Sequence, residues 1–211
     1  MKQLFLTSQV QFVAHDIGPK IANNLKKNSV FINTALKDKE HSDLEWHYTN
    51  KSKMEAEGFE FVDYDITGKT HDQILSDLSR FDVMYIEGGN SYYLLQESQK
   101  NSFINFVNQR VNEGMIYIST SAGSIIAGPD IEPVRQESRA ILAPELKGTK
   151  AYNLVDFVVI PHWGQEKRRD LFTSYRIEHI YNEDYPYILI NDNQYVEIEG
   201  DWIKIVDITK V

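Results

Sequence analysis

Cysteine is absent from this chain of 211 residues. Disulfide bonds, a thiolate nucleophile and a zinc site built from cysteine are therefore excluded. Long hydrophobic runs are missing as well: no segment could span a bilayer, and the apolar residues 4–6 are too few for the core of a secretory signal. These absences favour a cytoplasmic protein that makes no membrane contact.

Positive charge is scarce, because 22 Lys and Arg stand against 31 Asp and Glu, for a formal net charge of -9. Nucleic acids and anionic membranes bind clustered Lys and Arg, so we expect neither as a partner. The length and the lack of a linker predict one domain over residues 1–211. No pair of His or acidic residues has convincing metal spacing, and no glycine pattern indicates a nucleotide, so no cofactor is expected.

Short apolar segments alternate with amphipathic ones through most of the chain. Strands are predicted at residues 4–6, 29–34, 59–64, 83–86, 115–118 and 155–160, and helices at residues 17–26, 45–57, 71–81, 92–112 and 166–181. This alternation predicts an α/β three-layer sandwich, in which helices cover both faces of a mainly parallel sheet. The C-terminal segments 187–190, 194–199 and 202–208 predict a small antiparallel edge.

One serine lies where a predicted buried strand, a sharp turn and a helix meet. The sequence Ser119-Thr120-Ser121-Ala122-Gly123 follows the apolar residues 115–118. Small residues around a serine at such a turn are typical of a nucleophile elbow, whose usual pattern is G-x-S-x-G. Here Ser119 stands in the first glycine position. The same residues are also typical of close packing and a helix N-cap, so the string alone leaves both interpretations open.

Three loops follow the carboxyl ends of predicted parallel strands, at Gly88-Gly89-Asn90, Thr120-Ser121-Ala122 and Pro161-His162-Trp163. Loops at these strand ends line one edge of an open α/β sheet, where ligands bind. His162 is the only one of six imidazoles at a strand end. The other five lie in polar segments and are predicted to be surface residues: His15, His41, His47, His71 and His179.

The chemistry of these groups suggests their roles. A serine hydroxyl is a poor nucleophile until a base accepts its proton, so Ser121 is a candidate nucleophile and His162 its candidate general base. The backbone amides of Gly89 and Ala122 are candidates for an oxyanion hole. Considered separately, the glycines also fit a plain strand-to-helix turn, and His162 also fits a buried structural histidine.

Together, the motifs carry a family resemblance. Gly88-Gly89-Asn90-Ser91, Thr120-Ser121-Ala122-Gly123-Ser124 and Ile160-Pro161-His162 have the order and approximate spacing of the dipeptidase E (aspartyl dipeptidase) and cyanophycinase family of serine peptidases. The chain resembles this family from its first strand to Tyr195. The resemblance implies a fold similar to class I glutamine amidotransferases, with a flavodoxin-like core and serine in place of their cysteine. It also implies hydrolysis of peptide bonds involving aspartate, and it supports the roles given above to Ser121, His162, Gly89 and Ala122.

The third catalytic residue departs from the family pattern. Family members carry an acid in the loop after the elbow helix, where this chain has Gln136. The nearest carboxylate, Glu137, is therefore the predicted third member, with Glu132 and Asp130 as weaker candidates. A Ser-His dyad is also left open.

Substrate contacts are predicted at Asn90 in the glycine loop and at Arg168 and Arg169, which with Lys167 begin the helix after His162. These cations would bind an acidic substrate side chain, although an exposed, charged helix start is the alternative. The prediction is a serine-type peptidase that acts on small peptides, including Asp-containing ones, through an acyl-enzyme. A non-catalytic binding protein and an esterase or amidase are the alternatives, and a homodimer is left open.

Overall fold

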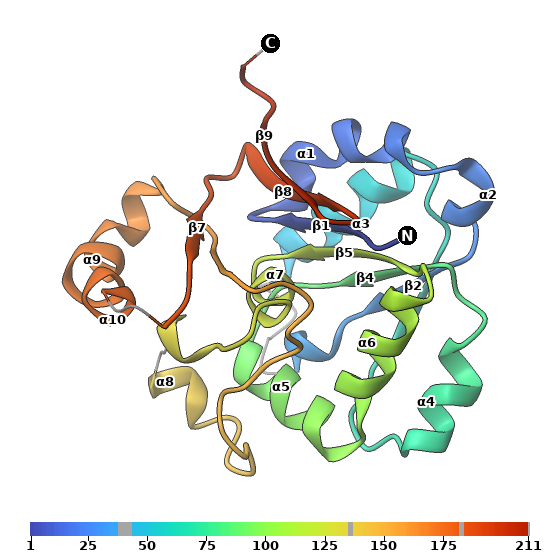
Figure 1. The fold of residues 1–211 in the computed structure, drawn as a ribbon, viewed down its shortest axis with the longest axis horizontal. Helices are drawn as coiled ribbons and strands as arrows, with labels where there is room; N and C mark the ends of the chain where they lie inside the picture. The colour runs from blue at the N-terminus through green and yellow to red at the C-terminus, as the bar shows by residue number, and fades with distance from the viewer. Residues whose placement is uncertain (38–43, 135–136, 182–183, 211) are drawn as a thin grey trace.

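The computed structural model describes residues 1–37, 44–134, 137–181 and 184–210, with only the backbone of residues 137, 138 and 179. A seven-stranded sheet runs through the molecule in the order β3-β2-β4-β5-β1-β8-β9 (Figure 1). The first five of these strands are parallel, and β8 and β9 join β1 as an antiparallel edge. Their bounds are β1 Gln3–Thr7, β2 Ser29–Ile32, β3 Phe61–Tyr64, β4 Val83–Ile86, β5 Ile116–Thr120, β8 Gln194–Glu199 and β9 Trp202–Asp207.

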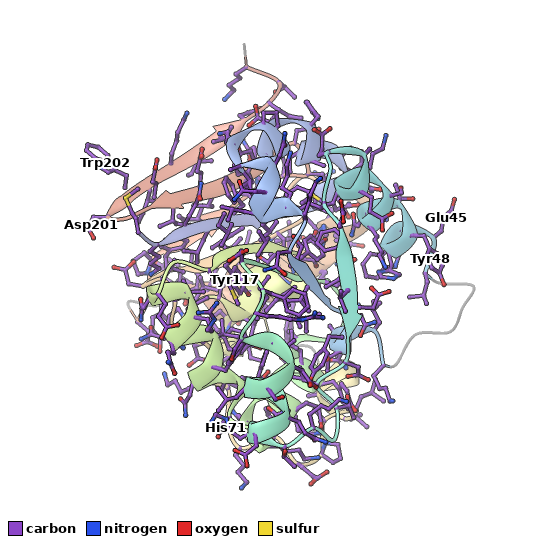
Figure 2. The ribbon with its side chains drawn as sticks, turned by 90° about the vertical axis from the view of Figure 1, so that its right-hand side faces the viewer. Glu45, Tyr48, His71, Tyr117, Asp201 and Trp202 are labelled. Atoms are coloured by element: carbon purple, nitrogen blue, oxygen red, sulfur yellow. The ribbon has the colours of Figure 1, made fainter. Side chains whose placement is uncertain are left out.

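Helices cover both faces of this sheet (Figure 1). One face carries α1 (Val10–Ile17) and α3 (Glu45–Ala56), and the other carries α4 (His71–Leu78), α5 (Ser91–Lys100), α6 (Phe103–Asn112) and α7 (Ala122–Ile126). Alternate residues of each strand enter the two cores: Val83 and Tyr85 face the first, Met84 and Ile86 the second. Tyr117 lies deep in the molecule in Figure 2.

The predicted α/β sandwich, with a mainly parallel sheet and an antiparallel C-terminal edge, is confirmed. Within the described residues, no helix has both the length and the apolar character needed to cross a membrane. The short hairpin β8–β9 forms the edge, and its turn residue Asp201 lies at the periphery of the molecule beside Trp202 (Figure 2).

Two predicted helices have different bounds. The segment predicted as a helix at residues 17–26 is a 3-10 turn, Gly18–Lys20, and the short α2, Asn23–Lys26. The apolar stripe of α1 ends at Ile17, and Pro19 interrupts the helical hydrogen bonding that follows. The single helix predicted at residues 92–112 divides into α5 and α6 because Ser102 is left-handed, with φ of 60°.

The strand before His162 lies outside the main sheet. β6 (Val158–Ile160) pairs in parallel with β7 (Tyr187–Leu189) in a separate two-stranded sheet, with Ile160 opposite Leu189. The prediction that residues 155–160 join the main sheet and the prediction that residues 187–190 join the antiparallel edge are both wrong. A short apolar run indicates that a strand is buried, but it does not indicate which strand it pairs with.

Between β6 and β7 the chain forms a helical arm. It consists of the 3-10 turn Glu166–Arg168, α9 (Arg169–Leu171), a π-helical turn Phe172–Arg176, and α10 (Ile177–Ile180). In Figure 1 this arm and β7 lie to one side of the main sheet. The arm therefore supplies side chains to the end of the sheet from outside it.

Candidate active site

Ser121 occupies a sharp turn between β5 and α7. Its backbone has φ of 49° and ψ of -107°, a conformation that non-glycine residues rarely adopt. The turn is tight because Gly123 packs against β4: a Cβ there would lie 2.4 Å from the Ile86 carbonyl oxygen. At the first position of the motif, the buried hydroxyl of Ser119 lies 2.9 Å from that of Ser124, so a serine is accommodated there.

His162 brings its ring to this turn from the end of β6. Its Nε2 lies 2.8 Å from the Ser121 Oγ, which is hydrogen-bond distance. The backbone of His162 is also left-handed, with φ of 68°, and its amide donates to the buried hydroxyl of Ser8 at 2.8 Å. Two residues from different sheets are thus held in uncommon conformations that direct their side chains toward each other.

Asp192 lies on the far side of the His162 ring. Its Oδ1 is 3.3 Å from His162 Nδ1 and accepts a hydrogen bond from Ser8 Oγ at 2.6 Å. Its Oδ2 accepts from the side-chain amides of Gln9 at 2.9 Å and Gln165 at 2.6 Å. The carboxylate is therefore surrounded by donors, and the hydroxyl, the imidazole and the carboxylate form a continuous chain.

The parallel register of β6 and β7 explains this arrangement. The amide of Ile190 donates to the Ile160 carbonyl, and the amide of Trp163 donates to the Ile190 carbonyl, both at 3.0 Å. His162 and Asp192 therefore leave the two strands at the same level.

The surroundings of Asp192 and His162 lower the pKa values of both side chains. Burial would raise the pKa of the Asp192 carboxyl, but hydrogen bonds from His162, Ser8 and Gln165 outweigh it and lower the pKa to about 2. Burial lowers the pKa of His162 below its ordinary 6.5, and the nearby guanidinium groups of Arg168 and Arg176 act in the same direction. The hydrogen bond to Asp192 opposes this lowering. At neutral pH the pair is thus a carboxylate beside a neutral imidazole.

The loop after β4 lies next to Ser121, since β4 and β5 are neighbours in the sheet. Gly89 has φ of 133°, and a Cβ there would lie 2.2 Å from the Ala35 carbonyl oxygen, so only glycine fits. The Gly89 carbonyl accepts from Arg139 Nη1 at 2.7 Å. Among the described residues, the amides of Gly89 and Ala122 have no acceptor. They are the donors that a substrate oxygen could use.

A buried acid supports this loop from behind. Glu87 is fully buried and accepts hydrogen bonds from the Gly88 amide at 2.7 Å and from Asn50 Nδ2 at 3.1 Å. His47 Nδ1 lies 3.0 Å from its other carboxylate oxygen. The prediction that His47 is a surface residue is therefore wrong. One face of α3 packs on the sheet, although the sequence of this helix is mostly polar. Burial raises the pKa of Glu87, against the lowering by these partners.

A cleft of about 290 Å³ opens over Ser121 and His162. Trp46 and Asn50 of α3 line one side, and Lys167 and Arg168 line the other. A smaller cavity of about 30 Å³ adjoins it and is lined by Ser121 and Arg176, among others. Its volume is about that of one small polar group.

Arg176 is the least satisfied charge at the site. Its side chain comes from the π-helical turn, and the residue is 4 % exposed. Its Nε and Nη1 have no hydrogen-bond partner among the described residues. Its guanidinium stacks on Phe172, 5.0 Å from the ring centroid. Burial, followed by the charges of Arg168 and Arg139, lowers its pKa to about 10. A buried cation with unused donors beside other cations is suited to bind an anion.

The predicted substrate contacts lie in different places. Arg168 lines the cleft, whereas Arg169 points away from it and pairs with Glu166 at 3.3 Å. Asn90 is buried: its Oδ1 caps α5, and its Nδ2 donates to the Arg139 carbonyl at 3.1 Å. This geometry gives Asn90 a positioning role in the loop. Neither Gln136 nor the side chain of Glu137 is among the described residues, so Glu137 stays a prediction.

The sequence analysis missed several residues that the structure brings to this site. Asp192 follows a strand end, as His162 does, and the same rule would have found it if β7 had been predicted as a parallel strand. Arg139 and Arg176 lie in irregular helical turns, and no pattern marked them. Gln9 and Gln165 gave no signal either. Over the described ranges, no group of three or more acidic or histidine side chains could hold a metal ion.

Comparison with known proteins gives one consistent family. Residues 4–206 match the model of Peptidase family S51. The chain is 32% identical over 165 residues to an uncharacterized peptidase of Pasteurella multocida, covering 77% of this chain and 78% of that protein. It is 30% identical over 149 residues to a peptidase E of Salmonella newport, covering 69% of this chain and 60% of that protein.

Two solved structures of proteins described as peptidases have similar folds. A crystal structure from Listeria monocytogenes, provisionally described as a peptidase E, superposes with a TM-score of 0.83 at 27% identity and covers 98% of both chains. A peptidase from an acI-B1 Actinobacterium superposes with a TM-score of 0.71 at 14% identity, covering 98% of this chain and 88% of the other, and shows the same fold.

Proposed function

Because this chain belongs to peptidase family S51 and is thus a serine-type peptidase, we propose that it hydrolyses small acidic peptides through an acyl-enzyme on Ser121. The observation that carries this proposal is the 2.8 Å contact between Ser121 Oγ and His162 Nε2 on the strained turn. We assign the third position to Asp192 in place of Glu137, since Asp192 lies at His162 Nδ1.

In the proposed mechanism, Ser121 Oγ attacks the scissile carbonyl while His162 Nε2 takes its proton. The amides of Gly89 and Ala122 bind the oxygen that becomes negative, and each such donor contributes on the order of 3 kcal/mol. The imidazolium then gives its proton to the leaving amine, and the Asp192 carboxylate stabilises its charge. A water molecule, activated by the same imidazole, releases the acyl group and restores the serine.

The arginines support a preference for an acidic side chain on the acyl side of the scissile bond. Arg176 faces the small cavity next to Ser121, with Arg139 lining the same cavity. Arg168 lines the adjoining cleft. A carboxylate in the small cavity would give Arg176 the acceptors that the described residues do not provide. Of the cations predicted from sequence at residues 167–169, Lys167 and Arg168 line the cleft. Arg139 and Arg176 add to them at the small cavity.

A fluorophosphonate probe tests the nucleophile directly. We expect the wild-type enzyme to be labelled on Ser121 and the Ser121→Ala variant to show no labelling, because only an activated serine attacks this phosphorus. Intact-protein mass spectrometry measures the adduct. A Ser124→Ala variant is the matched control, since its hydroxyl is buried against Ser119 and the Thr7 carbonyl. Wild-type protein that stays unlabelled would contradict the proposal.

The pH dependence follows from the His162 environment. The base must be neutral, so activity is lost as pH falls through its pKa, which burial holds below 6.5. We therefore expect kcat/KM to show one acidic limb with its midpoint below pH 6.5. Asp192, with a pKa of about 2, adds no limb between pH 4 and 9. A midpoint above 6.5, measured in buffers of constant ionic strength, would argue against this environment.

A further inference from the structure

The side-chain amide of Gln165 connects the carboxylate beside His162 to an arginine that lines the cleft. The Gln165 Nε2 donates to Asp192 Oδ2 at 2.6 Å, and its Oε1 accepts from Arg168 Nε at 2.9 Å. The two partners fix the orientation of the amide, since a carboxylate requires a donor and a guanidinium requires an acceptor. The carboxylate behind the base is thus linked through a single planar group to a cation that lines the cleft.

Arg168 can respond to a ligand without breaking this link. Its Nε is used by Gln165, which leaves the two terminal nitrogens of the guanidinium for an anion in the cleft. Burial and the charge of Arg139 lower the pKa of Arg168, so the protein itself compensates this charge poorly. An anion that binds there would hold the guanidinium in one position, and Gln165 with it.

We propose that Gln165 is a positioning residue that couples anion binding at Arg168 to the alignment of Asp192 and His162. Gln165 Nε2 also lies 3.2 Å from His162 Nδ1, close to the contact that Asp192 makes with the ring. Both nitrogens are donors here, because Nδ1 carries the ring proton when the ring Nε2 accepts from Ser121. A Gln165 amide held by Arg168 donates to Asp192 Oδ2 and leaves Oδ1 to His162 Nδ1. A released amide competes with the ring for Oδ1. This inference rests on the proposed function, because it concerns how an acidic substrate prepares its own hydrolysis.

Gln9 provides a matched control. Its Nε2 donates to the same Asp192 oxygen at 2.9 Å, and its Oε1 accepts from Gln11 Nε2 at 2.8 Å. It has no contact with Arg168 in the described part of the chain. Gln9 and Gln165 therefore donate to the same carboxylate, but only Gln165 is also bonded to Arg168. If the only effect of a substitution is a lost hydrogen bond to Asp192, the Gln9 and Gln165 variants should behave alike.

A double-mutant cycle on the full chain tests the coupling. Turnover of the dipeptide Asp-Leu is measured for the wild type, Gln165→Met, Arg168→Met and the double variant, and again with Gln9→Met in place of Gln165→Met. We expect Gln165→Met to lower kcat by about 10- to 100-fold when Arg168 is present and by less than about 3-fold on the Arg168→Met background. Gln9→Met should lower kcat by the same factor on both backgrounds.

A second variant separates coupling from folding. Gln165→Glu keeps an acceptor for Arg168 but removes the donor to Asp192, and it should also lower kcat by about 10-fold or more with little change in KM. Melting temperatures show whether each variant folds. If Gln165→Met does not fold, the kcat of Gln165→Glu decides whether the inference holds. Equal effects of Gln165→Met on both backgrounds, coupling by Gln9, or an unchanged kcat in Gln165→Glu would overturn the inference. A wild type without peptide turnover would instead overturn the proposed function, and this inference with it.

Discussion

Replacing Asp192 with asparagine is expected to lower kcat by about four orders of magnitude while KM changes little. The amide has no charge to stabilise the His162 imidazolium, and its NH₂ group can hold the ring in the wrong tautomer. The two side chains have nearly the same shape, so packing beside Ser8 and Gln165 is kept. Steady-state kinetics on an acidic dipeptide measures the effect, and an Asp201→Asn variant on the exposed β8–β9 turn is the control.

The same experiment separates the two candidates for the third position. Glu137→Gln, assayed in parallel, should lower kcat by less than about 3-fold if Asp192 holds this role. A large loss in Glu137→Gln together with a small loss in Asp192→Asn would return the role to the residue predicted from sequence. Similar small losses in both would indicate a Ser-His dyad.

Asp192 should also affect stability in acid. Its folded-state pKa of about 2 lies below the ordinary 3.8, so its ionised form stabilises the fold at pH values above 3.8. This contribution is lost as pH falls toward 2. The wild type should therefore lose more of its free energy of unfolding over this interval than Asp192→Asn does.

Replacing Arg176 with methionine is expected to reduce kcat/KM for an Asp-containing dipeptide by about 10²- to 10⁴-fold. Two charge-assisted hydrogen bonds to the substrate carboxylate would be lost, each worth about 1.5–3 kcal/mol. Turnover of the neutral Asn analogue should fall far less, so the preference for acid disappears. Arg169→Met is the matched control, because Arg169 is exposed and paired with Glu166.

The same Arg176 substitution should raise the melting temperature. The guanidinium is buried, and two of its nitrogens have no partner in the part of the chain that the structure describes. An apolar side chain of similar length removes the cost of that burial. Differential scanning fluorimetry measures the shift. Equal losses of turnover with acidic and neutral substrates, together with a lower melting temperature, would show that Arg176 serves the fold rather than recognition.

Much of the fold could be predicted because its strands are short, apolar and regularly spaced. The elbow at Ser121 and the glycine loop at Gly89 could also be located, since tight turns require small residues whatever surrounds them. The catalytic roles given to these residues stay predictions. Their proximity follows from β4 and β5 being sheet neighbours.

The residues that the sequence did not reveal are placed by tertiary contacts, which sequence patterns do not indicate. The antiparallel edge predicted from segments 187–190 and 194–199 places Asp192 in the turn between them, and only the parallel pairing of β7 with β6 brings the residue to His162. Arg176 is buried, although a lone arginine in a polar segment usually indicates a surface position. The polar surroundings of His47 predict a surface position for the same reason, but its contact with the Glu87 carboxylate compensates its burial.

The groups of the proposed active site come from two separate parts of the fold, the main sheet and the small β6–β7 sheet with its helical arm. The main sheet and the turns at its strand ends supply Ser121 and the two amides, whereas the continuous segment 158–192 supplies the imidazole, its carboxylate and two of the arginines. Substrate preference can therefore diverge within some thirty-five consecutive positions, through changes in the arm, while the proposed nucleophile stays on an unaltered main sheet.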